Sequence, residues 1–171
     1  MDIKENEIVL KPLQDTDIDL FSQWLDKTYI YRWLCPGGEE YRKAWLDEVN
    51  NRNDAYPYMK HFIVYYNDKK IGFCLYMDCY FDREYIPEHY GITVDKKESV
   101  FEIGYFIGEE EYLNKGIGKR IVRRLEDIIT ETGGREIFAD PDEENTASVK
   151  TLLYNGFTKI KDGDYRKKII V

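Results

Sequence analysis

One segment of the chain has the composition of an anion-binding loop, and it reads "NKGIGK" over residues 114–119. It follows a strong strand pattern and opens a helical pattern. Glycine lets a ligand approach the backbone closely, and the N-terminus of a helix favours negative charge. The loop therefore predicts a pyrophosphate site, with a tight strand-to-helix turn that binds no ligand as the alternative.

Two other phosphate-binding motifs fit this loop less well. A Walker loop carries Ser or Thr directly after its Gly-Lys pair, whereas Arg120 stands there in this chain. The dinucleotide pattern GxGxxG needs a third glycine, and Ile121 occupies its place. Neither a nucleoside triphosphate nor a dinucleotide is the ligand that the loop predicts best.

Composition and charge limit the partners of the protein. The chain has 171 residues, 43% of them hydrophobic, and a net charge of −8. That length suits one domain, and the negative charge disfavours binding to nucleic acid or to an anionic membrane. It would attract a small cationic substrate, although simple solubility explains the charge as well.

The cysteines and histidines suggest no metal site. Cys35, Cys74 and Cys79 form no CxxC pair, and their odd number is typical of free thiols in a reducing compartment. His61 and His89 lie in different elements, with no carboxylate or cysteine at ligand spacing. No apolar run is long enough to span a membrane, so we predict a cytoplasmic protein without a bound metal.

The elements that must position the loop follow from hydrophobic periodicity. Residues 7–13 predict a strand, a helix follows with Asp15 as its N-cap, and residues 40–52 predict a second helix. Residues 61–67 and 71–80 predict a hairpin. The first half is thus a strand, two helices and two strands.

The second half alternates strands and helices. Its predicted elements are a long irregular surface loop at 81–99, a strand at 99–108, a helix from Gly116 to Gly133, a strand at 135–140, a helix capped by Asn145 and ending at Gly156, and a hairpin over 158–171 that turns at Asp162 and Gly163. Alternate residues of the strand at 99–108 face opposite sides, which places Glu102 and Gly104 on one face. Loops as long as 81–99 are often functional.

The second half resembles the GCN5-related N-acetyltransferase (GNAT) family. In that family a strand runs into a loop of pattern Q/R-x-x-G-x-G/A, and a later helix begins at an Asn and ends before Gly-Phe. The matching segments here are "FEIGYFIGEEEYLNKGIGKRIV" and "NTASVKTLLYNGF", with Leu113 at the Q/R position. The resemblance implies a single GNAT domain over residues 1–171, of class α/β (α+β), with a mixed central sheet of about seven strands flanked by about four helices.

Within the family, several segments are similar to aminoglycoside 6'-N-acetyltransferases, among them "YIYRWLCPGG", "KKIGFCLY" and "ADPDEEN". This similarity implies transfer of an acetyl group from acetyl-CoA to an amine, by a monomer or a homodimer. The residues that the resemblance assigns to the cofactor are Phe106, Ile107, Gly108, Leu113, Asn114, Lys115, Gly116, Ile117, Gly118, Lys119 and Asn145.

The group that removes a proton from the amine needs a separate argument. An alkyl amine with a pKa near 10 is protonated at pH 7 in all but about one molecule in a thousand, so a base or a route to water is required. The resembling enzymes carry an Asp at the position of Gly104. Glu102 lies on the same strand face, about 6.6 Å earlier, and is our candidate for the base or a water relay. The alternative is a carboxylate that only attracts cations.

Three other positions bear on the substrate and on the leaving group. Asp140 matches an acidic substrate contact of the aminoglycoside enzymes, and Trp33 is placed near the substrate. Asp140 could also belong to a solvated charged loop. A Tyr that protonates the thiolate in many family members is replaced here by Leu152, and Tyr154 lies about 200° around the helix, so it should face away.

Three functions remain open at this stage. The first is an N-acetyltransferase for a small cationic substrate such as an aminoglycoside. The second is a protein N-acetyltransferase of the ribosomal-protein type, and the third is an acyl-CoA-binding protein that has lost catalysis. Gly104 and Leu152 motivate the third, because both stand where relatives keep proton-transfer groups.

Overall fold

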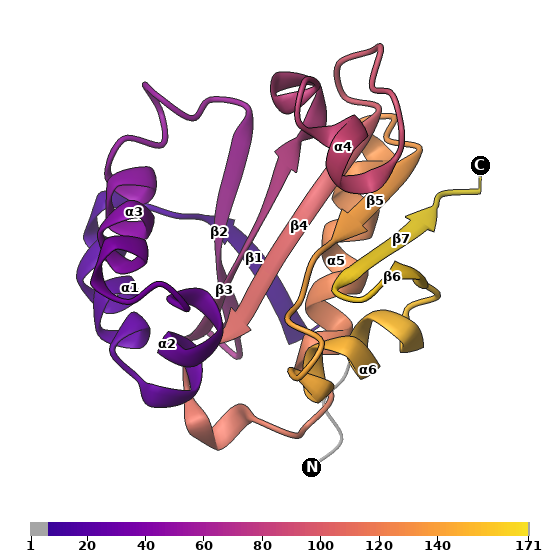
Figure 1. Cartoon of the computed structure of the whole chain (residues 1–171). Coiled ribbons are helices and arrows are strands. Elements are labelled where there is room, and N and C mark those ends of the chain that lie inside the picture. The colour runs from indigo at the N-terminus through magenta and orange to yellow at the C-terminus, as the bar shows by residue number, and fades with distance from the viewer. Residues whose placement is uncertain (1–6, 171) are drawn as a thin grey trace. The chain divides into compact units, whose positions relative to one another are not determined.

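Seven strands form one mixed sheet in the order β1-β2-β3-β4-β5-β7-β6, and six α-helices accompany them in a computed structural model that describes residues 7–170 (Figure 1). The elements are β1 (Ile8–Pro12), α1 (Ile18–Leu25), α2 (Thr28–Leu34), α3 (Glu39–Asn50), β2 (Met59–Tyr66), β3 (Lys69–Asp78), α4 (Ile86–Tyr90), β4 (Val100–Ile107), α5 (Ile117–Glu131), β5 (Glu136–Ala139), α6 (Thr146–Tyr154), β6 (Thr158–Lys161) and β7 (Asp164–Lys168). The predicted fold class is confirmed. Within the described residues, no helix has the length and apolar character needed to cross a bilayer.

The chain forms two compact units. The first unit comprises the chain up to Cys74 together with Tyr105–Ile117, and the second comprises Leu75–Gly104 together with Gly118–Val171. Strands β3 and β4 each continue from one unit into the other. The expectation of a single domain remains a prediction.

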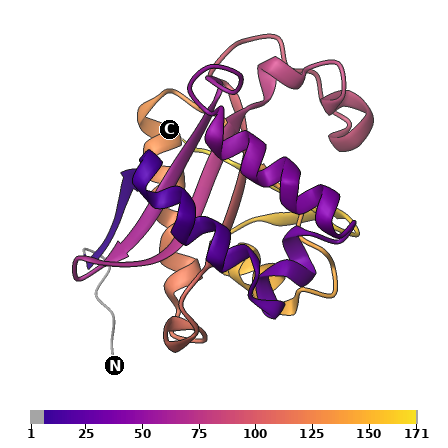
Figure 2. The same ribbon diagram turned by 90° about the vertical axis from the view of Figure 1, so that its left-hand side faces the viewer.

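In the first unit, three helices accompany the β1–β2 pair and the first half of β3. Strands β1 and β2 pair antiparallel, with Ile8 opposite Tyr66. The turn between β2 and β3 has positive φ at both Asn67 and Asp68, as a tight hairpin requires. Figure 2 shows α1 and α3 lying across these strands. The predicted strand, helix, helix and hairpin are confirmed here.

Aromatic rings build the core of the first unit. The ring of Phe21 lies 4.7 Å from that of Phe73 and 6.0 Å from that of Phe106, measured between centroids. Trp24 is 1% exposed and meets Phe106 edge to face. These contacts attach α1 to β3 and to the end of β4, where the predicted cofactor residues begin.

In the second unit, β4 and β5 are parallel, and β5, β7 and β6 pair antiparallel. Helix α5 connects to β7 through Lys167, whose ammonium lies 2.7 Å from the Glu126 carboxylate. Helix α6 connects to α5 through Asn155, which donates to the carbonyl of Lys119. Asn145 caps α6 as predicted, since its side chain accepts from the Ser148 N–H.

The segment 79–98 is more ordered than the predicted surface loop. It contains a 3₁₀ turn at Cys79–Asp82 and helix α4. One Asp78 carboxylate oxygen accepts from the N–H of Tyr80, and the other accepts from the N–H of Glu98, so this side chain closes the base of the segment. The buried residues that give the segment its own core are Cys79, Ile86, Tyr90, Val94, Val100 and Phe138.

Two further predictions about helices were wrong. Asp15 does not cap the first helix: a 3₁₀ turn at Asp15–Asp17 comes first, and α1 begins at Ile18. Two helices were predicted in the first half, and the interval between them contains a third, α2. With α4, these short helices raise the number from the four expected to six.

Gly108 and Gly104, both near the end of β4, differ in the space around them. A Cβ at Gly108 would lie 2.3 Å from the indole of Trp24, whereas a Cβ at Gly104 would meet Leu75 at 3.6 Å. We therefore expect Gly108→Ala to lower the free energy of unfolding by about 1–3 kcal/mol because of overpacking, and Gly104→Ala to change it by less than about 1 kcal/mol. Urea denaturation measures both. Equal losses of unfolding free energy in the two variants would contradict overpacking against Trp24 as the cause.

Candidate functional site

The glycine loop adopts the conformation that an anion cradle needs. Asn114 and Gly116 both have positive φ, 58° and 75°, and α5 begins directly afterwards at the buried Ile117. A Cβ added at Gly116 would meet no atom within 4 Å. The backbone is therefore open to solvent at the position where a phosphate has to approach.

The start of α5 supplies the charge that such a ligand needs. The first N–H groups of any helix have no intrahelical acceptor, and the helix dipole favours an anion there. Lys115 is exposed, and the ammonium of Lys119 lies 4.0 Å from the ring centroid of Tyr154. These residues fit a pyrophosphate, and the cofactor roles of this loop remain predictions.

The end of β4 is held from α2 and from the residue before it. The Tyr29 hydroxyl lies within hydrogen-bonding distance of the carbonyls of Ile107 and Gly108, at 3.1 and 2.9 Å, and the ammonium of Lys27 donates to Gly108 at 2.6 Å. The N–H of Gly108 donates to the carbonyl of Ile71. Both backbone polar groups of Gly108 thus have partners within the protein, so a contact of these groups with the cofactor would compete with those partners.

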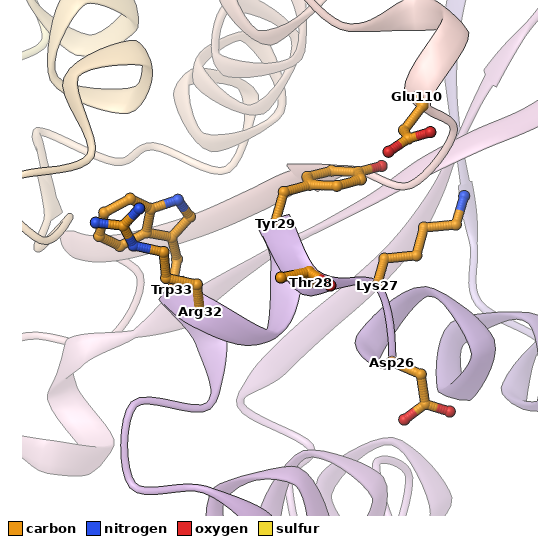
Figure 3. Close-up of a pocket in the computed structure, with 7 residues that line it drawn as sticks. All are labelled: Asp26, Lys27, Thr28, Tyr29, Arg32, Trp33 and Glu110. Carbon is orange, nitrogen blue, oxygen red and sulfur yellow. The ribbon is translucent and has the colours of Figure 1, made fainter.

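Trp33 borders a pocket of about 500 Å³ in the first unit. The residues that line it are Asp26, Lys27, Thr28, Tyr29, Arg32, Trp33 and Glu110 (Figure 3). Figure 3 shows the Tyr29 hydroxyl directed toward Glu110, and burial together with this carboxylate raises the pKa of Tyr29 to about 12. The guanidinium of Arg32 lies 4.3 Å from the Trp33 ring, so one face of that ring already carries a cation.

A cluster of carboxyl groups occupies the second unit. Glu102 on β4 interacts electrostatically with Asp140, which follows β5, and with Asp164 on β7. The Tyr90 hydroxyl donates to the Glu102 carboxylate at 3.1 Å. His89 Nε2 lies 3.1 Å from Asp164 Oδ1. The structure therefore places Glu102, the candidate base, and Asp140, the candidate substrate contact, in one cluster, although they are distant in sequence.

This environment shifts both predicted carboxyl groups toward the neutral form. Burial, followed by the charge of Asp140, raises the pKa of Glu102 to about 8 against the lowering effect of the Tyr90 hydrogen bond. Part of Asp140 is exposed at the surface, yet desolvation of its carboxyl group, opposed by His89 and assisted by Asp164, raises its pKa to about 6. A base with a pKa near the working pH is well suited to proton transfer.

The other acidic residues after Asp140 face elsewhere. Glu143 accepts from the Tyr165 hydroxyl at 2.8 Å and lies 2.5 Å from the ammonium of Lys159. Asp142 is exposed and accepts from the N–H of Glu144. Of the acidic stretch at 140–144, Asp140 is the member that interacts with Glu102.

Three residues of the cluster were not predicted: His89, Tyr90 and Asp164. His89 and Tyr90 belong to α4, whose five residues show no hydrophobic periodicity. Asp164 directly follows the turn residue Gly163, a position at which an exposed residue is expected. No local signal in the sequence distinguishes them. Their contacts depend on strand order and on the fold of segment 79–98.

The last helix lacks a proton donor where relatives carry Tyr. Leu152 is fully buried, whereas Tyr154 is 70% exposed and its ring lies beside Lys119, so the two residues lie on different faces of α6. Asn145 uses its side-chain oxygen to cap α6, and its predicted contact with the cofactor remains a prediction.

Comparison with protein families identifies the chain. The model of the acetyltransferase (GNAT) domain matches residues 14–165. The chain belongs to the GNAT family of acetyltransferases. The resemblance inferred from the glycine loop is thereby confirmed, and membership supports an acetyl-CoA-dependent N-acetyltransferase.

Solved structures share this GNAT fold at low sequence identity. The aminoglycoside acetyltransferase AAC(6')-Ib in complex with coenzyme A is 17% identical, with a TM-score of 0.71 over 94% of each chain. An aminoglycoside N(6')-acetyltransferase from Legionella pneumophila is 16% identical, with a TM-score of 0.71 over 95% of this chain and 91% of its own. RimL, a ribosomal L7/L12 α-N-protein acetyltransferase, is 16% identical, with a TM-score of 0.70 over 98% and 92%.

The raised pKa of Glu102 has a consequence for stability. The unfolded chain releases this proton near pH 4.5 and the folded GNAT domain holds it to about pH 8, so stability is lost as the pH rises between these values. We expect Glu102→Gln to match the wild type at pH 5 and to be more stable at pH 9 by about 1–3 kcal/mol. Urea denaturation at both pH values measures this.

The control for this comparison is Glu144→Gln, a change at an exposed carboxylate in the same unit. It should leave the difference between pH 5 and pH 9 as in the wild type. An unchanged difference in Glu102→Gln would contradict the burial of an uncharged carboxyl group.

Proposed function

We propose that this GNAT domain acetylates an amine of a small polycationic substrate, with Glu102 as the base. The observation that carries this proposal is the cluster in the second unit in which Glu102 accepts a hydrogen bond from Tyr90 and is influenced by the charges of Asp140 and Asp164. Carboxyl groups that raise one another's pKa favour a bound ammonium group over separate negative charges. Aminoglycosides, which the similar enzymes are named for, have the required chemistry.

Glu102 is well matched to the proton that must leave. An alkyl ammonium group has a pKa near 10, and an ordinary glutamic acid near 4.5 is too weak a base by about 5.5 units. With the pKa of Glu102 at about 8, the gap falls to about 2 units, each worth about 1.4 kcal/mol. A fraction of about one tenth of Glu102 is ionised at pH 7 and able to accept the proton.

The residues at 113–119 would hold the cofactor. When bound, acetyl-CoA supplies the acetyl thioester. The open backbone at Gly116 and the N–H groups that begin α5 would bind its pyrophosphate, with Lys115 nearby. The predicted contacts of Phe106, Ile107 and Asn145 belong to the same proposal.

A second candidate is acetylation of a protein N-terminus. The fold similarity to RimL and the buried Leu152 favour it. An α-amino group has a pKa near 8, so it needs less help from a base than an alkyl amine does. We also infer a cytoplasmic protein, because all three cysteines are free thiols. That it acts as a monomer or a homodimer stays a prediction from the sequence.

Thiol release from acetyl-CoA decides between these substrates. We expect turnover with aminoglycosides or polyamines, and a fall in kcat/KM of about 10²- to 10⁴-fold in Glu102→Gln, because the base is lost. Glu144→Gln should retain wild-type activity. Turnover on ribosomal-protein peptides alone, detected by mass spectrometry, would replace the first candidate by the second. Coenzyme A binding without turnover on any amine would contradict both.

Cofactor binding can be tested at two matched glycines. Gly116 and Gly133 both have positive φ and nothing within 4 Å of an added Cβ, so Ala costs about 1 kcal/mol of strain at each. We expect Gly116→Ala to raise the Kd for coenzyme A about tenfold, because its Cβ enters the space left for the phosphates. Gly133→Ala should leave that Kd unchanged. Calorimetric titration measures both, and equal affinities would refute the site.

A further inference from the structure

Tyr90, the last residue of α4, is held rigidly within the second unit. It is 3% exposed, and its ring lies 4.3 Å from the Phe138 ring and 4.5 Å from the His89 imidazole, measured between centroids. His89, its neighbour in the helix, lies 3.1 Å from Asp164 on β7 and 2.9 Å from the Tyr85 hydroxyl. The position of the Tyr90 hydroxyl is therefore fixed by contacts on several sides.

That hydroxyl donates to Glu102 Oε2 at 3.1 Å. A phenol can donate one hydrogen bond, and a carboxylate that loses its water needs donors to replace it. The titratable groups that interact with Glu102 come from several elements: Cys79 and Asp82 on the 3₁₀ turn, Tyr85 and Tyr90 before and on α4, Asp140 after β5, and Asp164 on β7. His89 on α4 interacts with Asp140 in the same cluster. Three of these groups are carboxylic acids, so a neutral donor is especially valuable.

We infer that Tyr90 is a positioning residue, which orients the Glu102 carboxylate through its hydroxyl and makes α4 the support of the base. The inference rests on the proposed function for the role of Glu102. It explains why segment 79–98 has a buried core and a carboxylate closing its base, since a mobile loop could not hold this hydroxyl in place. Tyr90 contacts the base and need not contact the substrate.

The hydrogen bond from Tyr90 shifts the pKa of Glu102 in a direction that can be measured. It stabilises the ionised carboxylate and lowers the pKa of Glu102 against burial and Asp140. In Tyr90→Phe the ring contacts stay and the donor is lost. We expect the pKa of Glu102 to rise by about one unit, which corresponds to a tenfold change in its ionisation at neutral pH.

The experiment is a carbon-13 NMR titration of the carboxyl groups of Glu-labelled protein, with Glu102→Gln used to assign the resonance. The control is Tyr165→Phe, which removes another buried phenol that donates to a carboxylate, that of Glu143. It should leave the pKa of Glu102 unchanged. The same pKa of Glu102 in Tyr90→Phe and in the wild type would overturn the inference.

A second measurement needs no substitution. In the wild type, the ring carbon that bears the Tyr90 hydroxyl should change its chemical shift in step with the titration of Glu102. A chemical shift of this carbon that stays constant while Glu102 titrates would also overturn the inference, even if Tyr90→Phe failed to fold.

The rate profile separates this inference from the proposed function. In Tyr90→Phe, kcat/KM should fall about tenfold at pH 7 and approach the wild-type value above the new pKa, because only the ionised fraction changes. An equal loss at all pH values would indicate a structural role alone and overturn the inference. A wild type that acetylates no amine would refute the proposed function, while the titrations would still decide the role of Tyr90.

Discussion

Removing the carboxyl group of Glu102 from water is the constraint on which the second unit depends. Burial is the largest influence on this group, and the nearest charges, Asp140 among them, are negative. An isolated buried charge is expensive, so the group responds by keeping its proton to a higher pH and by accepting a hydrogen bond from Tyr90. Helix α4 carries Tyr90, and the Asp78 carboxylate closes the base of the segment that contains this helix.

The first unit solves a related problem for backbone groups. Where the chain leaves β4, the carbonyls of Ile107 and Gly108 have no further strand to pair with, and buried carbonyls need donors. Tyr29 and Lys27 supply them. Gly108 also leaves room for the indole of Trp24, which a Cβ would displace. The rigid turn that results leads into the glycine loop and gives it a fixed starting point.

The parts of the fold that local physics determines could be predicted from the sequence. Alternation in "SVFEIGYFIG" predicted β4, and Asn145 with Gly156 predicted both ends of α6. Helices α2 and α4 have seven and five residues, which is too few to form without tertiary contacts. Segments this short show no hydrophobic periodicity from which a helix could be predicted. The site divides in the same way. Glu102 and the glycine loop stood out in the sequence, whereas Asp164 and Tyr90 matter only through contacts distant in sequence.

Under the proposed function, the raised pKa of Glu102 accounts for Gly104 and Leu152, which replace the proton-transfer residues of the resembling enzymes. An Asp at position 104 would project a shorter carboxyl group beside Leu75, whereas burial, followed by the charge of Asp140, raises the pKa of Glu102 to about 8. A thiol has a pKa near 8.5, so Glu102 and a departing thiolate would hold a proton with almost equal affinity. If Glu102 is the base, as proposed, its conjugate acid can return the proton to the thiolate, and a separate acid is needed less. Under the proposed function, the buried Leu152 is therefore compatible with catalysis.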